Sequence, residues 1–232
     1  MPDLPVSDIL DVKLSQLLDA PGCPLCARRT QAGAGFLDSV LLEGVTDTKL
    51  RRDLRSARGF CPRHTHQLLS AERSQHGSTT SSAVLLAAIA DVHATELTAA
   101  AAKRGTQRKR ALGHSRRPPR CLCCGAEDSA VADGCGRLAR LVAAPEWQAA
   151  AAAAAFCLDH LLMLLEAMAD DTAAAAIAQR QLARIEDLRE RLDRMAHNSS
   201  YDRRHLLTDD EKRSAGEAAA LLGHDPKPAG DR

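Results

Sequence analysis

The amino-acid sequence predicts an all-α fold, namely a duplicated helical metal-binding module followed by C-terminal helices. Apolar residues recur at the three- and four-residue spacing of amphipathic helices, and no stretch alternates convincingly as a strand would. A Cys-x-x-Cys pair followed by a Cys-x-x-His pair also occurs twice in the 232 residues. Only five residues are aromatic and most apolar residues are Ala or Leu, so the core is thin and metal sites would offset that weakness.

Residues 1–103 are expected to hold an N-terminal helix and the first module. A helix that begins near Ser7 has one apolar face and stops at Pro21-Gly22. That face contains Ile9, Leu10, Leu14, Leu17 and Leu18. A second helix after Cys26 should end at Gly44.

Two more helix starts follow in the first module. Asp47 is placed to cap a short basic helix, and Cys61-Pro62 should begin another helix because proline suits the first helical position. A helix rich in Ala and Leu then runs to about Lys103. Residues 104–120 are expected to be a basic linker, since 103–120 contains eight basic residues, two prolines and no acidic residue.

The second half of the chain should be helical as well. Residues 121–170 form the expected second module and residues 171–223 the C-terminal helices, with a flexible tail at 224–232. A long helix from Thr172 has apolar residues near a heptad spacing, namely Ile177, Ile185, Leu188, Leu192 and Met195. Thr208 and Glu211 should make a capping box for a last helix that ends at Leu222-Gly223.

The two cysteine regions are repeats of each other. Cys121 and Cys124 follow Cys23 and Cys26 by 98 residues, and Cys157 and His160 follow Cys61 and His64 by 96. Apolar residues match too, with Phe60 at the position of Phe156. Pairing neighbours along the chain predicts two four-ligand sites. The first contains Cys23, Cys26, Cys61 and His64, and the second contains Cys121, Cys124, Cys157 and His160.

The ligand types favour zinc. Zn²⁺ binds three thiolates and one imidazole in a tetrahedron, and a Cys-x-x-His at a helix start puts both ligands on one face of the helix. We therefore expect two Zn²⁺ ions per chain, with an iron–sulfur cluster as the alternative. In the second site Cys123 could replace Cys121 or Cys124, and Cys123 and Cys135 could instead be redox-active thiols.

The motifs C-P-L-C, F-L-D-S-V-L-L-E-G-V-T-D and R-G-F-C-P-R-H resemble those of an uncharacterised bacterial family. That family has tandem CPxC and GFCxxH motifs and is known only as a domain of unknown function. The resemblance covers residues from about 10 to 222, including the stretch from Tyr201 that contains E-K-R-S-A-G-E-A-A-A. It implies a helical metal-binding fold and no particular activity. The second module departs from the pattern, with C-L-C-C where CPxC is usual.

Composition and termini indicate the compartment. A net charge of +1 gives no global attraction to nucleic acid or membrane. The N-terminus lacks the features of a signal peptide, and because the apolar stretches are short or interrupted by charge, we expect none to span a bilayer. We expect a cytoplasmic protein without a membrane partner, in which eight reduced cysteines serve metal or redox chemistry.

Several functions are compatible with these features. The sequence contains no P-loop, dinucleotide-binding, metalloprotease or serine-hydrolase motif, so we expect a non-enzymatic interaction or regulatory protein. A protein partner or a second copy of the chain could dock on the helix at 177–195. The alternatives are a redox or metal sensor, and nucleic-acid binding through the basic residues 103–120.

Overall fold

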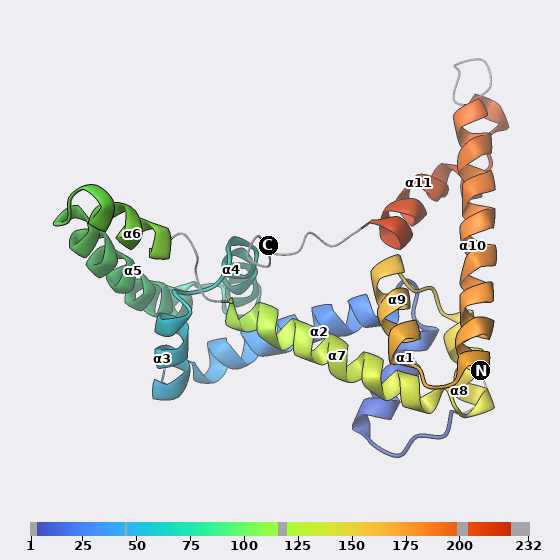
Figure 1. Cartoon of the computed structure of the whole chain (residues 1–232), viewed down its shortest axis with the longest axis horizontal. Helices are drawn as coiled ribbons and strands as arrows, with labels where there is room; N and C mark the ends of the chain where they lie inside the picture. The colour runs from blue at the N-terminus through green and yellow to red at the C-terminus, as the bar shows by residue number, and fades with distance from the viewer. Residues whose placement is uncertain (1–3, 45, 116–119, 199–203, 224–232) are drawn as a thin grey trace. The chain divides into compact units, whose positions relative to one another are not determined.

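The structure is a computed structural model that describes residues 4–44, 46–115, 120–198 and 204–223. These residues form eleven α-helices and one 3-10 turn, and no strand occurs among them (Figure 1). The prediction of an all-α fold is confirmed. The helices are α1 Ile9–Asp19, α2 Pro24–Glu43, α3 Thr48–Ser56, α4 Pro62–His76, α5 Thr80–Ala101, α6 Gly105–Ser115, α7 Leu122–Leu141, α8 Pro145–Ala153, α9 Leu158–Ala167, α10 Asp171–His197 and α11 Asp209–Leu222. The 3-10 turn is Arg204–Leu206.

The chain forms two compact units whose boundaries differ from the expected modules. Unit 1 consists of residues 1–29 and 130–226, and unit 2 of residues 30–129 and 227–232. The expected division at 1–103 and 121–170 therefore needs correction. The physical reason is that the N-terminal helix buries its apolar face in the same core as residues far along the chain.

Unit 1 has a core that contains the aromatic side chains of Trp147 and Phe156. Leu14 of α1 and Leu25 of α2 are fully buried there together with Leu138 of α7, Trp147 of α8 and Phe156. Trp147 donates its indole N–H to the carbonyl of Pro5 at 3.0 Å. α10 packs against α8, α9 and α11 of the same unit.

The heptad-like face of α10 is used inside unit 1. Ile177 and Leu188 are buried, and Ile185, Leu192 and Met195 are half-buried. The predicted capping box is present in α11, where Thr208 accepts from the N–H of Glu211 and Glu211 accepts from the N–H of Thr208. Glu211 also accepts from Arg194 of α10 at 2.9 Å, so the cap is tied to the neighbouring helix.

Unit 2 contains a second core, formed by Leu residues of α2 and α3 with Leu68 of α4 and Leu85 of α5. Asp47 caps α3 as predicted, and Pro62 occupies the first turn of α4. Between these helices the backbone reverses at Arg58 and Gly59, which have φ angles of 58° and 94°. A Cβ at Gly59 would lie 2.9 Å from Ile89, so this turn requires glycine.

That turn also fixes the position of the Gly-Phe-Cys motif. Arg58 is buried and its guanidinium donates to Glu96 of α5 at 2.7 Å. Because Cys61 follows three residues later, this ion pair and the packing of Gly59 on Ile89 together hold the start of α4 against α5. The G-F-C part of the family motif thus has a structural explanation.

The expected basic linker is helical over most of its length. Residues Gly105–Ser115 form α6, which packs against α5 in unit 2. Gln, Arg, Lys, Ala and Leu all favour helix, and α6 packs against α5, where Arg108 and Leu112 line one surface hollow together with Leu97 and Ala100. The helix preference of these residues and the packing of α6 on α5 outweigh the repulsion between exposed like charges. Residues 116–119 of the expected linker lie outside the described residues, as do residues 224–232 of the expected tail.

One helix of the described part, α5, is long and apolar enough to cross a membrane by length and composition. This finding corrects the expectation that no stretch would qualify. The core helix of a soluble protein also passes this criterion, although such a helix is mostly buried and the apolar window of α5 is 17% buried. α5 also carries Asp91 and Glu96, and it packs against α3, α4 and α6.

Candidate metal centres

The eight predicted ligands gather into two groups of three cysteines and one histidine. Site 1 contains Cys23, Cys26, Cys157 and His160, and site 2 contains Cys61, His64, Cys121 and Cys124. In each group the four ligand atoms lie within 4.8 Å of one another. Site 1 belongs entirely to unit 1 and site 2 entirely to unit 2.

The pairing of the half-sites differs from the prediction. Each Cys-x-x-Cys meets the Cys-x-x-His of the other repeat, so Cys23 and Cys26 do not join Cys61 and His64, and Cys121 and Cys124 do not join Cys157 and His160. The cause is the division of the chain into units, since residues 1–29 fold with residues 130–226. The repeat itself cannot distinguish the two pairings, because exchanging equivalent half-sites leaves the same ligand sets.

In both sites the ligands come from the starts of helices. Cys23, Cys61, Cys121 and Cys157 each precede a helix directly, and the carbonyl of each accepts the first backbone hydrogen bond of that helix. The second ligand lies three residues later, within the first turn. A helix N-terminus carries partial positive charge, which favours thiolate over thiol. Each centre therefore ties together the starts of two helices, α2 with α9 in site 1 and α4 with α7 in site 2.

The distances in site 1 are slightly shorter than the edges of a zinc tetrahedron. The Nδ1 atom of His160 lies 3.4, 3.2 and 3.2 Å from the sulfurs of Cys23, Cys26 and Cys157. The sulfurs of Cys26 and Cys157 are 3.6 Å apart. Zinc bonds of ~2.3 Å to sulfur and ~2.0–2.1 Å to nitrogen at tetrahedral angles predict edges of about 3.8 and 3.6 Å.

Site 2 repeats this arrangement. The Nδ1 atom of His64 lies 3.3 Å from the sulfur of Cys61 and 3.4 Å from those of Cys121 and Cys124. The sulfurs of Cys61 and Cys124 are 3.8 Å apart. The same ring nitrogen faces the sulfurs in both sites, so the two centres share their ligand geometry as well as their ligand types.

The protonation of the thiols indicates why a cation suits these sites. Hydrogen bonds from Cys157 and Cys26 lower the pKa of Cys23 to about 3, while hydrogen bonds to Cys157 and Cys23 raise the pKa of Cys26. In site 2, burial and the neighbouring sulfurs of Cys121 and Cys61 raise the pKa of Cys124 to about 12. Three sulfurs this close cannot all be anionic without a positive ion between them. A divalent cation removes that conflict, so the donor set fits a bound metal.

Site 2 has a buried carboxylate behind its histidine. Glu127 is 3% exposed, and its Oε1 lies 3.0 Å from Nε2 of His64, the ring nitrogen that faces away from the sulfurs. Its Oε2 accepts from Arg63 at 2.5 Å. Gly33 of α2 makes room, since a Cβ there would lie 2.6 Å from Oε1 of Glu127. Such a carboxylate fixes the imidazole in the orientation that presents Nδ1 to the metal.

Glu127 is a functional residue that the motif analysis missed, although the repeat contains a signal for it. Arg29 lies 98 residues before Glu127, at the equivalent position of the other repeat. Asp159 lies 96 residues after Arg63, again at the equivalent position. The acid and the base are thus exchanged between the corresponding helices of the two sites. A charge exchange at matched positions marks residues that belong to the site without being ligands.

Solvent access also distinguishes the sites. In site 2 His64 is fully buried, and Cys121 and Cys124 are 8% and 6% exposed. In site 1 Cys26 is exposed and Cys23 is half-buried. Reagents in solution therefore reach a ligand of site 1 far more easily than most of site 2.

Cys123 and Cys135 lie outside both four-ligand groups. Cys123 contacts the carbonyl of Gly33 at 3.6 Å and its sulfur also lies within 4.8 Å of ring and carboxylate atoms of His64 and Glu127. Cys135 lies in the core of unit 1. Both are buried, and burial raises the pKa of each thiol. Cys121 and Cys124 hold the positions that the sequence left open to Cys123, and the burial of Cys123 and Cys135 argues against a role as exposed redox thiols.

We expect Glu127→Gln to weaken metal retention at site 2. The amide keeps the shape of the side chain but loses the charge that orients His64, and the expected loss in affinity is about tenfold or more. Competition with a zinc chelator measures it. Glu43→Gln, which alters an exposed glutamate of α2 in the same unit, should have no effect. Equal zinc affinity of the two variants would show that Glu127 only stabilises the fold.

Comparison with known proteins gives a family but no activity. The family model for a family of unknown function (DUF6062) matches residues 3–197, which include all eight residues of sites 1 and 2. No curated protein and no solved structure matches the chain. The match ends before residues 201–222, which the motif resemblance had included. The resemblance to an uncharacterised family is confirmed, and the chain belongs to this family of unknown function.

Proposed function

We propose that this protein binds two zinc ions and acts as a non-enzymatic interaction or regulatory module. The observation that supports it best is the pair of Cys3His groups whose ligand atoms lie within 4.8 Å of one another, at spacings close to the edges of a zinc tetrahedron. Four protein ligands leave no open position for water or substrate, which is typical of structural zinc. The metals would stabilise a fold with a thin apolar core by joining helix starts.

The geometry favours one ion over an iron–sulfur cluster. All four ligand atoms of each site lie within 4.8 Å of one another, which is the space around a single ion. A cluster of several irons and sulfides would hold its cysteines farther apart, around its outer surface. The sulfurs would have to separate before such a cluster could enter.

The partner surface is expected on the helices that stay exposed. The heptad-like face of α10 is packed inside unit 1, so docking there would require that packing to open. In unit 2, Val84 and Leu97 of α5 and Leu112 of α6 are exposed, next to the basic residues of α6. These residues support docking of an apolar or acidic protein segment. The same basic helix is where nucleic-acid binding should be tested.

Metal analysis of protein purified without added metal or chelator tests the zinc assignment. We expect about two zinc per chain, no labile sulfide and no visible absorption. Zinc, iron and sulfide are measured on the same sample. Iron with sulfide and a brown colour would show that the sites hold an iron–sulfur cluster instead of zinc. Protein without any metal would refute both centres.

A second candidate function is thiol-based regulation at site 1, favoured by the exposure of Cys26. Hydrogen peroxide would oxidise two of its thiolates to a disulfide. The two electrons lost by sulfur reduce the peroxide, with two protons, to two water molecules. Loss of two ligands would release the zinc of site 1 and loosen α2 from α9.

This candidate predicts two populations of zinc. About half of the bound metal should leave rapidly when a chelator or peroxide is added, and the other half slowly, because site 2 is buried. A colorimetric zinc indicator follows the release, and mass spectrometry should find Cys26 or Cys23 modified first. The double variant Cys123→Ser/Cys135→Ser is the matched control and should leave the fast phase unchanged. Release in one uniform phase would exclude a regulatory difference between the sites.

A further inference from the structure

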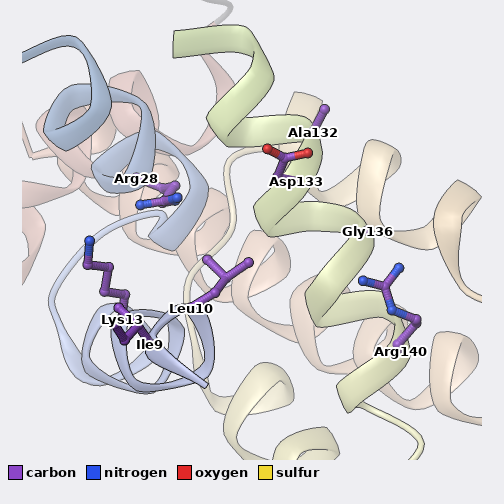
Figure 2. Close-up of a pocket in the computed structure, with 8 residues that line it drawn as sticks. All are labelled: Ile9, Leu10, Lys13, Arg28, Ala132, Asp133, Gly136 and Arg140. Carbon is purple, nitrogen blue, oxygen red and sulfur yellow. The ribbon is translucent and has the colours of Figure 1, made fainter. Parts of the chain in front are cut away.

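Unit 1 contains an open cleft outside both metal sites. It has a volume of about 550 Å³ and lies between α1, the start of α2 and α7. Figure 2 shows the side chains that line it, namely Ile9, Leu10, Lys13, Arg28, Ala132, Asp133, Gly136 and Arg140. The zinc chemistry proposed above uses none of these residues.

The cleft lining contains three cations and one acid. Lys13 comes from α1, Arg28 from α2 and Arg140 from α7, and the single acid is Asp133. Among the described residues none of these four makes an ion pair or a side-chain hydrogen bond. The Nε atom of Arg28 is buried and has no hydrogen-bond partner there. A buried donor left unsatisfied is unfavourable, and no hydrogen bond or ion pair among the described residues explains why Arg28 holds that position.

A neighbouring arginine shows what a structural pair looks like on the same surface. Arg137 of α7 donates to the buried Asp11 at 2.7 Å and pairs with Asp8 at 3.0 Å. These contacts hold α1 on α7, and the guanidinium of Arg137 keeps the pKa of Asp11 below its usual range. Arg140 is the penultimate residue of α7 and has no such partner among the described residues. Fold stability therefore explains Arg137 but leaves Arg140, Arg28 and Lys13 unexplained.

The shape and apolar wall of the cleft limit what can bind. Gly136 and Ala132 on α7 leave the space open, and a Cβ added at Gly136 would meet only Arg140, at 3.9 Å. Ile9, which is 75% exposed, and Leu10 add apolar surface on α1, where Lys13 lies beside Ile9 (Figure 2). The lining thus combines three cations with an apolar surface.

We propose that this cleft binds a small organic anion that carries a carboxylate or phosphate group on an apolar body. Arg28 and Arg140 present planar guanidinium groups, which suit the paired oxygens of either anionic group, and Lys13 adds a mobile charge. The apolar body of the ligand lies against Ile9 and Leu10. Asp133 disfavours ligands with several negative charges.

Binding is tested on the purified full-length protein with its metal, by calorimetry at low ionic strength. The probes are hexanoate and hexyl phosphate, with hexanol and hexylammonium as neutral and cationic counterparts. We expect saturable binding of at least one anion and none of the counterparts. Binding of hexanoate alone or of hexyl phosphate alone identifies the anionic group. Inorganic phosphate should bind more weakly than hexyl phosphate because it lacks the apolar body.

Variants connect the binding to this cleft. Arg28→Gln and Arg140→Gln should each weaken the anion about tenfold or more, since a charge-assisted hydrogen bond is lost. Gly136→Leu keeps every charge but fills the cleft, and should also abolish binding. Arg189→Gln, at an exposed position of α10 in the same unit, is the control and should change nothing.

The outcomes that overturn the proposal are distinct from failure of the metal sites. Binding of neither anion, binding that Arg140→Gln and Gly136→Leu leave intact, or equal binding of hexanol would each refute it. Zinc content and helical circular dichroism are recorded for every variant. Arg140 is exposed, so its replacement should not disturb folding even if Arg28→Gln does.

Discussion

The zinc content of two double variants should show which half-sites belong together. Cys26→Ser/Cys157→Ser removes two ligands from site 1 and should leave one zinc per chain. Cys26→Ser/Cys61→Ser removes one ligand from each site and should leave almost none after mild chelation. The pairing of neighbours along the chain predicts the reverse, with two losses in the first variant and one in the second. Zinc per chain, measured after the same chelator wash, separates the two pairings.

The matched controls use the spare cysteines. Cys123→Ser and Cys135→Ser change buried thiols in the two units without touching a ligand, and should keep both metals. If a double variant unfolds, cadmium substitution of the unaltered protein provides an independent measurement. NMR correlations from each ¹¹³Cd to the cysteine and histidine protons should group Cys26 with His160 and Cys124 with His64. Correlations from one cadmium to both Cys26 and His64 would contradict the structure.

The helices and the ligand types follow from local sequence, whereas the pairing of the half-sites does not. The caps at Asp47 and Thr208 are local signals, because a side chain a few residues away completes each one. The same is true of Cys61-Pro62 at the start of α4. Which Cys-x-x-Cys meets which Cys-x-x-His depends on packing over more than a hundred residues, for example Leu14 and Leu25 against Leu138.

The basic segment shows a different limit of prediction from the sequence. Its charge pattern indicated a linker, but the helix formers of α6 and its packing against α5 favour a helix. Glu127 shows a third limit, since no ligand motif includes it. It becomes recognisable only when the repeat is aligned beyond the ligands, where Arg29 and Asp159 carry the opposite charges. In this chain, internal comparison carries more information about the site than motif spacing does.

Removing both metals should unfold much of the protein. Structural zinc contributes about 10–16 kcal/mol per site in small zinc-dependent domains, while the net stability of a folded protein is only about 5–15 kcal/mol. Here each ion would join helices distant in sequence, since site 1 links α2 to α9 and site 2 links α4 to α7. Without the ion, three sulfurs and an imidazole crowd together with nothing to bind, and burial of site 2 makes that arrangement unfavourable.

Chelation at neutral pH under reducing conditions, followed by circular dichroism and thermal melting, measures this effect. We expect a loss of cooperative melting and of much of the helical signal, with both restored when about two equivalents of zinc are added. The Cys26→Ser/Cys157→Ser variant is the matched intermediate, because it should lose only the contribution of site 1. Its unit 2 should still melt cooperatively and respond to chelation. If the metal-free protein melted at the same temperature as the zinc-bound protein, the ions would be regulatory or adventitious, and the apolar cores around Leu14 and Leu68 would be sufficient for folding.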